Sequence, residues 1–315
     1  MENVKRNTLF PARGNQAAAA ARGGLAQFWK RHEKRLLGIL FVLPALYLLW
    51  QFSYGAFFQT LYNSVHLTNI RGQAVAFCGF DLYRSLLSGE EFWNSCLVSV
   101  EFVLLTVLPS LAAALALAAL CRGRMPGGRL INVLFSMPVA VSSACVTMVF
   151  MTLLEPSMGL VNELLGLDLK WYLDSELALV SVAMVVNWNL IAMDFIFLSA
   201  ALRAVPVSYY ESASLDGADG WKVFRNITLP SVSPTLFFLT VVNILQTFQA
   251  FGPINIMTGG GPSGATDVLS YSIYRDAFVN YQFSPAAAKS VLLFFILLGV
   301  TMVQMKSEKR RVFYQ

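Results

Sequence analysis

Six long apolar stretches divide this sequence, and their length constrains the fold more than any other feature. A helix needs about 20 residues to cross roughly 30 Å of bilayer hydrocarbon, and each stretch reaches that length. Only 13% of the residues are Asp, Glu, Lys or Arg, against about 25% in a soluble domain, so too little polar surface exists to face water on every side. The sequence therefore predicts an all-α, polytopic membrane bundle of six transmembrane helices. The expected spans are residues 36–60, 94–121, 130–154, 177–202, 231–254 and 285–305.

The basic residues are distributed unevenly, and their distribution predicts the orientation of the chain. With the N-terminus inside the cell, the two tails and the loops 122–129 and 203–230 hold 18 of the 23 Lys and Arg residues. The remaining five, on the opposite side, are Arg71, Arg84, Lys170, Arg275 and Lys289. By the positive-inside rule, both termini are expected in the cytoplasm. Residues 1–35 are interpreted as a basic cytoplasmic tail, and residues 36–310 as the membrane domain.

Several function classes do not fit the composition and the residue patterns. The net charge of +5 comes from cations at the edges of apolar runs, which is typical of a membrane protein and not of a nucleic-acid-binding surface. The four cysteines are scattered and the chain has only two histidines, so no metal site of the usual type is expected. We find no Ser/His/Asp set or paired carboxylates that would indicate an enzyme. A phosphate-binding loop of the form G-x-x-x-x-G-K followed by Ser or Thr is also missing from the sequence, so the chain is not expected to bind ATP in that way.

The segment 206–230, between the fourth and fifth spans, has the features of a helical elbow. Ser208 and Glu211 have the spacing of a capping box, which predicts that a helix starts at about Tyr209. Gly217 suits a left-handed helix terminus, where a side chain would be strained. The first half of the segment therefore predicts a short helix that ends in a tight turn.

The second half of the same segment predicts another short helix before the next span. Asp216 or Asp219 can cap it, and Pro230 is expected to open the fifth span. The resulting helix–turn–helix carries five large apolar or aromatic residues, which are Tyr209, Tyr210, Leu215, Trp221 and Phe224. These side chains need a surface to cover them, which the chain's own helices or the groove of a partner can provide.

The spacing in this elbow resembles the EAA loop of permease subunits of binding-protein-dependent ATP-binding-cassette (ABC) importers. The matching residues are Glu211, Ala213, Asp216, Gly217, Ala218, Phe224, Ile227, Leu229 and Pro230, while Ser212 stands where the family usually has Ala. Segments 251–264 and 266–291 also look like the carbohydrate-uptake branch of that family. The likeness covers roughly residues 36–310, and the most similar subgroup resembles permeases for sugars and glycerol phosphate, of the type found in the maltose importer.

The resemblance implies a function in transport and a set of partners. Two homologous permease subunits would form one translocation path in a bacterial cytoplasmic membrane, and each elbow would dock on one of two cytoplasmic ATPase subunits. Those ATPases would bind ATP and Mg²⁺, while this chain would bind no cofactor, and an external solute-binding protein would deliver the substrate for alternating access. The residues implied in ATPase coupling are Glu211, Ala213, Leu215, Asp216, Gly217, Ala218, Phe224 and Pro230. For Glu211, helix capping alone is the competing interpretation.

Polar residues in the fourth and fifth spans form a second candidate site. Such side chains are costly at membrane depth and usually face an interior or a cavity. The candidates are Asn187, Trp188, Asn189, Asp194, Asn243, Gln246 and Gln249. They can form interhelical hydrogen bonds, or the amides and an aromatic face can bind a sugar. The sequence leaves both interpretations open.

An ion-coupled secondary transporter is the alternative function. It would need a chain of membrane carboxylates or paired broken helices, and only Glu101 and Asp194 are available, in different spans and at different depths. None of the expected spans has Lys or Arg well inside it, although a phosphorylated substrate would normally attract such a cation. The sequence therefore favours a neutral sugar or oligosaccharide as the solute.

Overall fold

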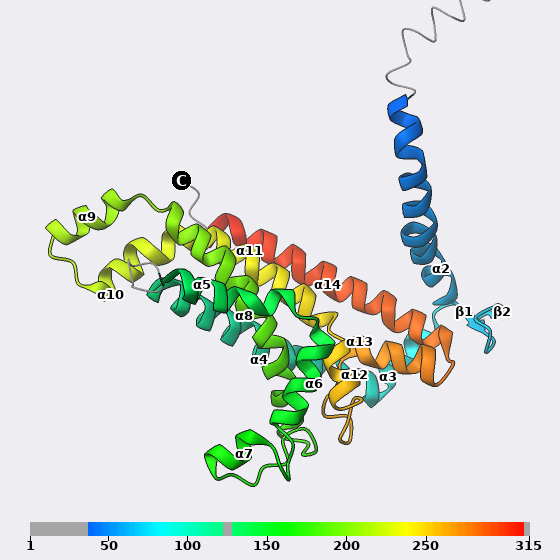
Figure 1. Ribbon diagram of the computed structural model, residues 1–315. Coiled ribbons are helices and arrows are strands. Elements are labelled where there is room, and N and C mark those ends of the chain that lie inside the picture. The colour runs from blue at the N-terminus through cyan, green and yellow to red at the C-terminus, as the bar shows by residue number, and fades with distance from the viewer. Residues whose placement is uncertain (1–36, 122–127, 312–315) are drawn as a thin grey trace, which may run out of the picture. The chain divides into compact units, whose positions relative to one another are not determined.

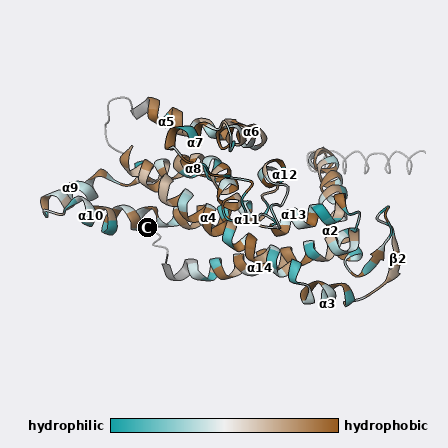
Figure 2. Ribbon diagram, turned by 90° about the horizontal axis from the view of Figure 1, so that it is seen from below, coloured by the Kyte–Doolittle hydropathy of each residue, from teal (hydrophilic) through white to brown (hydrophobic). Residues whose placement is uncertain are grey.

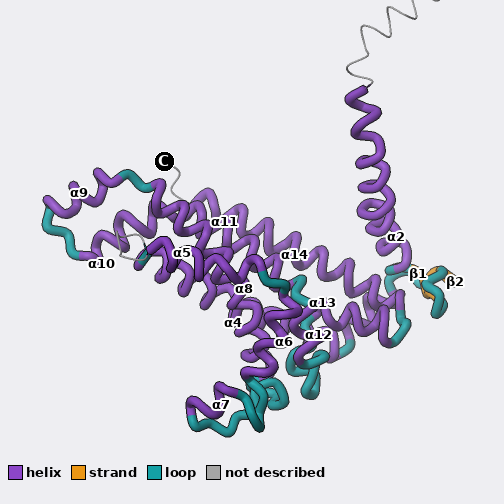
Figure 3. Tube along the Cα trace, in the orientation of Figure 1, coloured by secondary structure: helices purple, strands orange, loops and turns teal. Residues whose placement is uncertain are grey.

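The computed structural model describes residues 37–121 and 128–311, so the tail expected at 1–35 and most of the loop 122–129 lie outside the described residues. Most of the described chain is helical, with loops between the helices and one short hairpin (Figure 3). The chain divides into two compact units, Met1–Gln59 and Thr60–Gln315. The first unit holds most of one apolar helix, Leu37–Asn63, which confirms the expected helix at 36–60. A π-turn, η1 (Trp50–Tyr54), precedes its last part, α2 (Gly55–Asn63).

A bundle of four long helices forms the centre of the second unit. These are α4 (Glu90–Leu120), α8 (Ala178–Ala204), α11 (Leu229–Phe248) and α14 (Phe283–Arg311). α4 and α8 pack along each other, and α11 packs against both (Figure 1). Ala114 and Ala118 are buried among large side chains of α8 and α11, because small residues let helices approach closely.

The bundle leaves much of its apolar surface uncovered. Half of the most apolar window of α8 is buried, but only 28% of that of α4 and of α14. Hydrophobic residues therefore lie on outward faces of the helices as well as between them (Figure 2). Such surface is expected where a chain faces lipid or another membrane subunit.

The third span is not the continuous helix expected at 130–154. It consists of α5 (Gly128–Ser136), the 3₁₀-helix η2 (Met137–Ala140) and α6 (Ser143–Leu153), and its two parts are bent by 104°. Pro138 has no N–H to continue the helical ladder, Val141 is extended, and the Ser142 hydroxyl then caps α6 by accepting from the N–H of Cys145 at 3.3 Å. Five described helices are long and apolar enough to cross a membrane, or six if this bent pair counts as one span.

Shorter elements connect the long helices. The sequence analysis missed a hairpin of β1 (His66–Thr68) and β2 (Ala74–Phe77), in which His66 pairs with Phe77. The short helices are α3 (Asp81–Ser88), α7 (Leu160–Leu165), α12 (Gly252–Met257), α13 (Leu269–Tyr274) and the π-turn η4 (Arg275–Val279). The candidate span that contains the expected residues 231–254 runs from Gly220 to Met257, and within it α11 ends at Phe248 and a short irregular segment precedes α12.

The elbow differs from its expected form at two points. α9 (Val207–Leu215) starts before Tyr209, with Pro206 at its N-cap and no capping side chain, so the predicted capping box is wrong. The second helix is not separate from the fifth span. One continuous helix contains α10 (Gly220–Val223), the π-turn η3 (Phe224–Thr228) and α11. Pro230, near the start of α11, does not interrupt it.

Candidate functional site

The elbow lies at the end of the bundle where the last turns of α14 lie (Figure 1). Its turn is built as the sequence predicts. Gly217 has a φ of +68°, and the N–H of Ala218 donates to the carbonyl of Ala213 at 3.0 Å, which closes the end of α9. The carboxylate of Asp219 accepts from the N–H of Lys222 at 2.7 Å and so caps α10.

The elbow buries one small residue and exposes several large ones. Ala213 is buried against the chain itself, so its side chain packs inward and is not free for a partner. In contrast, Leu215 is 90% exposed and Trp221 is 68% exposed, with the ring of Trp221 stacked on that of Phe224. Exposed apolar residues on a projecting turn are typical of a docking surface.

Two buried polar residues of the fourth and fifth spans, Asp194 and Asn243, bind each other. The amide nitrogen of Asn243 donates to both carboxylate oxygens of Asp194, at 3.0 and 2.9 Å. Both residues are almost completely buried, so the pair joins α8 to α11 and does not face a cavity. Asn187 is similarly engaged, because its amide donates to the carbonyl of Leu105 at 3.0 Å, while its Oδ1 is buried without a partner in the described part of the chain.

Two of the predicted path residues do line one cavity. A cavity of about 320 Å³ lies where α6 begins and where the chain leaves α11 for α12. Its lining consists of Ser143, Val186, Asn189, Leu190, Gln246, Ala250, Phe251, Gly252 and Pro253. The hydroxyl, two amides and one aromatic ring among these groups can serve the polar edge and the apolar face of a sugar.

The remaining predicted path residues lie elsewhere. Trp188 is half exposed and lines a separate, apolar hollow of about 570 Å³ with Phe135 and Pro138. Gln249 is exposed at the C-cap of α11, outside the cavity lining. The sequence analysis missed Ser143 and Phe251. Two sequence features could have indicated these residues. Pro138 predicts a bend just before Ser143, and the Phe-Gly-Pro run that begins at Phe251 predicts a break after the fifth span.

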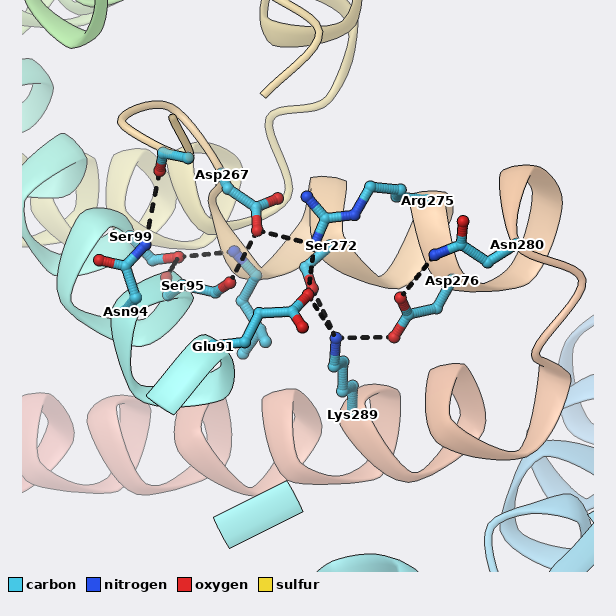
Figure 4. A network of polar contacts seen from close by, with 12 residues as sticks. Glu91, Asn94, Ser95, Ser99, Asp267, Ser272, Arg275, Asp276, Asn280 and Lys289 are labelled. Atoms are coloured by element: carbon cyan, nitrogen blue, oxygen red, sulfur yellow. Dashed lines mark hydrogen bonds and ion pairs between the residues drawn. The ribbon is translucent and has the colours of Figure 1, made fainter. Parts of the chain in front are cut away.

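A cluster of five charged residues lies at the other end of the bundle from the elbow, and the sequence analysis did not predict it. We call it the ion cluster, and its members are Glu91, Asp267, Arg275, Asp276 and Lys289 (Figure 4). The ammonium group of Lys289 is almost completely buried, 2.6 Å from a carboxylate oxygen of Asp276. The sequence alone did not indicate a partner for Lys289. One carboxylate, Glu91, is distant in sequence on α4, and the other, Asp276, lies in η4 before the sixth span begins.

Arg275 connects two carboxylates within the ion cluster. Its guanidinium forms ion pairs with Glu91 and with Asp267, the latter at 3.0 Å. Burial raises the pKa of the Asp267 carboxyl above its ordinary value, although Arg275 opposes the rise. Burial lowers the pKa of Arg275, but the carboxylates of Asp267 and Glu91 outweigh burial and raise it. The cluster therefore holds its charges by mutual pairing. Removing one partner of its buried pair, Lys289 and Asp276, costs about 3–5 kcal/mol.

Comparisons with known proteins agree on one family. The model of the family described as "Binding-protein-dependent transport system inner membrane component" matches residues 106–311. The chain is 36% identical over 284 residues to the sn-glycerol-3-phosphate transport system permease protein UgpA of Agrobacterium fabrum, covering 89% of this chain and 97% of the relative. The protein of the same name from Yersinia pestis is 34% identical over 288 residues, covering 89% and 96%.

Solved structures show the same fold. A crystal structure of a bacterial ABC transporter involved in the import of the acidic polysaccharide alginate matches with a TM-score of 0.77 and 22% identity, over 90% of this chain and 99% of that chain. The transporter in complex with an alginate pentasaccharide-bound periplasmic protein matches equally well, with a TM-score of 0.77 over 97% of its chain.

The pair of Asp194 and Asn243 generates a stability prediction. Replacing Asn243 with Leu leaves a buried carboxylate without two donors, so we expect a loss of about 2–4 kcal/mol in the free energy of unfolding. Thermal unfolding of the purified protein in detergent measures the loss. Adding Asp194→Leu should recover most of it, because the orphaned carboxylate is removed. A midpoint for Asn243→Leu that equals that of the unmutated chain would show that the pair does not stabilise the bundle.

Proposed function

Because this chain belongs to the family of inner membrane components of binding-protein-dependent transport systems, we propose that it forms half of a translocation path for a sugar or related polyhydroxylated solute. The chain is a transport subunit and not an enzyme. One observation carries the assignment of the solute. Ser143, Asn189, Gln246 and Phe251 meet around a single open cavity beside α8 and α11.

The chemistry of this cavity supports an uncharged solute. Hydroxyl and amide groups can both donate to and accept from the hydroxyl groups of a sugar, and the ring of Phe251 can cover its apolar face. The relatives are named for sn-glycerol-3-phosphate and the matching structures for alginate, and both of these solutes are anions that carry hydroxyl groups. The nine residues that line the cavity include no Lys or Arg, so this chain supplies hydroxyl recognition there and no charge for a phosphate.

Energy for transport comes from a partner. We propose that the elbow docks on a cytoplasmic ATPase, which binds ATP and Mg²⁺. Glu211, Asp216, Leu215 and Trp221 are exposed on it. The complete importer contains two copies of that ATPase, a second homologous permease and an external solute-binding protein. The family gives no support to the alternative of an ion-coupled secondary transporter. Asp194, one of the two carboxylates that such coupling could use, is hydrogen-bonded to Asn243.

The orientation in the bacterial cytoplasmic membrane is part of the proposal. The elbow and the last turns of α14 lie at one end of the bundle (Figure 1), and both carry basic residues, Lys222 and Arg225 in the elbow and residues 306 and 309–311 in α14. This arrangement supports a cytoplasmic elbow with both termini in the cytoplasm. The ion cluster then lies at the external end.

A pair of cysteine substitutions tests this orientation. Met158 and Ser307 are both exposed, and the proposal places them on opposite sides of the membrane. In a background without the native cysteines, an impermeant thiol reagent added to intact cells should label Met158→Cys and not Ser307→Cys. Permeabilised cells should label both. Labelling of Ser307→Cys from outside would reverse the proposed orientation.

Two glycine substitutions test the docking of the elbow. Gly217 and Gly166 both have a positive φ, and no atom lies within 4 Å of the place where a Cβ would be added. Valine at either position costs roughly 1–2 kcal/mol of backbone strain. We expect Gly217→Val to reduce co-purification of the ATPase at least tenfold, while Gly166→Val, at the end of α7, leaves it unchanged.

Crosslinking provides the direct readout of the same contact. A cysteine at position 215 in the assembled transporter should crosslink to the ATPase. If no position from 209 to 222 crosslinks and Gly217→Val retains the ATPase, the elbow is only a structural cap on the bundle.

Substitutions in the cavity test the solute path. Asn189→Leu and Gln246→Leu each remove hydrogen bonds to a solute, so we expect about a tenfold fall in uptake for each. Gln249→Leu is the matched control, because Gln249 is exposed but does not line the cavity. The assay measures uptake of radiolabelled sugars and sn-glycerol-3-phosphate at equal amounts of assembled transporter. Equal uptake in all three variants would exclude the cavity from the path.

A further inference from the structure

The short helix α13 touches the wall of the cavity directly. The hydroxyl of Ser270 donates to the carbonyl of Ala250 at 2.8 Å, and the ring of Tyr274 lies with its centroid 4.4 Å from that of Phe251. Tyr271 also stacks on Phe251. Ala250 and Phe251 both line the cavity, so a shift of α13 would move that wall.

Other contacts of α13 hold it to the ion cluster and to α4. The ammonium group of Lys289 donates to the hydroxyl of Ser272 at 2.7 Å, and it also pairs with Asp276 just beyond the helix (Figure 4). The N–H of Leu269 donates to the hydroxyl of Ser99 on α4 at 2.8 Å. α13 therefore connects the ion cluster on one side with the cavity wall on the other.

The wall segment is held locally by backbone hydrogen bonds, among them that from the N–H of Ala250 to the carbonyl of Thr247 at 3.0 Å. Residues 249–251 lie between α11 and α12, outside both helices. The ring of Phe251 also contacts Tyr271 and Tyr274, both of which belong to α13. The position of this wall therefore depends in part on where α13 is held.

We propose that Lys289 is a positioning residue for the solute cavity, because it holds α13 through Ser272 and Asp276 and so fixes Ala250 and Phe251. The ammonium group has three N–H donors, and it lies near Ser272, Asp276 and Glu91. A buried cation is costly at the end of a membrane bundle unless it is paired. This inference rests on the proposed function only in taking the cavity to be the solute path.

The test measures the position of the wall without reference to any solute. In the assembled transporter, with Cys78, Cys96, Cys121 and Cys145 replaced, Ala250→Cys provides a single thiol on the cavity wall. The readout is its alkylation rate with N-ethylmaleimide in lipid nanodiscs. We expect Lys289→Met to change this rate at least fivefold. The control Lys170→Met removes an exposed lysine and should change it less than twofold.

A second set of variants separates positioning from a general loss of folding. Ser272→Ala removes one partner of Lys289 but keeps its ion pair with Asp276, so it should shift the rate in the same direction by a smaller factor. Combining Lys289→Met with Ser270→Ala should change the rate no more than the larger single effect, because both act through α13.

Each outcome decides for or against the proposal. An unchanged rate in Lys289→Met, with normal assembly, would overturn it. If Lys289→Met does not assemble, Ser272→Ala decides, and an unchanged rate there would overturn the proposal equally. Failure of the proposed function would appear separately, as normal uptake in the Asn189 and Gln246 variants.

Discussion

The absence of water from bilayer hydrocarbon requires each polar group at membrane depth to find a partner inside the protein, and the arrangement of the bundle follows from this requirement. Asp194 and Asn243 satisfy it by binding each other between α8 and α11. The hydroxyl groups of Thr106 and Thr247 satisfy it by pairing between α4 and α11, at 3.2 Å. These contacts connect the three helices that pack most closely, so the polar groups determine which faces of the apolar helices meet.

The same requirement determines where the helices can break. Irregular backbone at membrane depth is tolerated where protein buries it or where it lines a cavity. The third span bends just before Ser143, and the fifth ends just before Ala250 and Phe251. All three residues line the same cavity. Two breaks that are far apart in sequence therefore meet around one space, and backbone groups at the second break find partners in Thr247 and Ser270.

The turn of the elbow and the presence of long apolar helices could be predicted from sequence, because they depend on neighbouring residues. Gly217 has the expected positive φ and Asp219 caps the helix that follows it. The capping box at Ser208 failed because the chain starts α9 earlier, after Pro206. Asp194 and Asn243 pair between the helices, whereas Asn189 and Gln246 line the cavity. Which residues do which depends on how α8 and α11 are rotated about their axes, and the sequence does not specify this rotation. The pairing of Lys289 with Asp276 and Glu91 depends on tertiary packing, which periodicity does not specify.

The continuity of the elbow with the fifth span has a mechanical consequence. α10, η3 and α11 form one helix from Gly220 to Phe248, with Trp221 exposed at one end and Gln246 at the cavity near the other. A separate second helix in the elbow would have allowed the turn to move without the span. Because no loop interrupts the helix, a displacement of the elbow would act on α11 directly, and the pair of Asn243 and Asp194 connects α11 to α8. The cavity wall is thus joined to two elements, α11, which continues to the elbow, and α13, which contacts the ion cluster. If the elbow docks on an ATPase as we propose, motion at either end of the bundle would reach the same few residues.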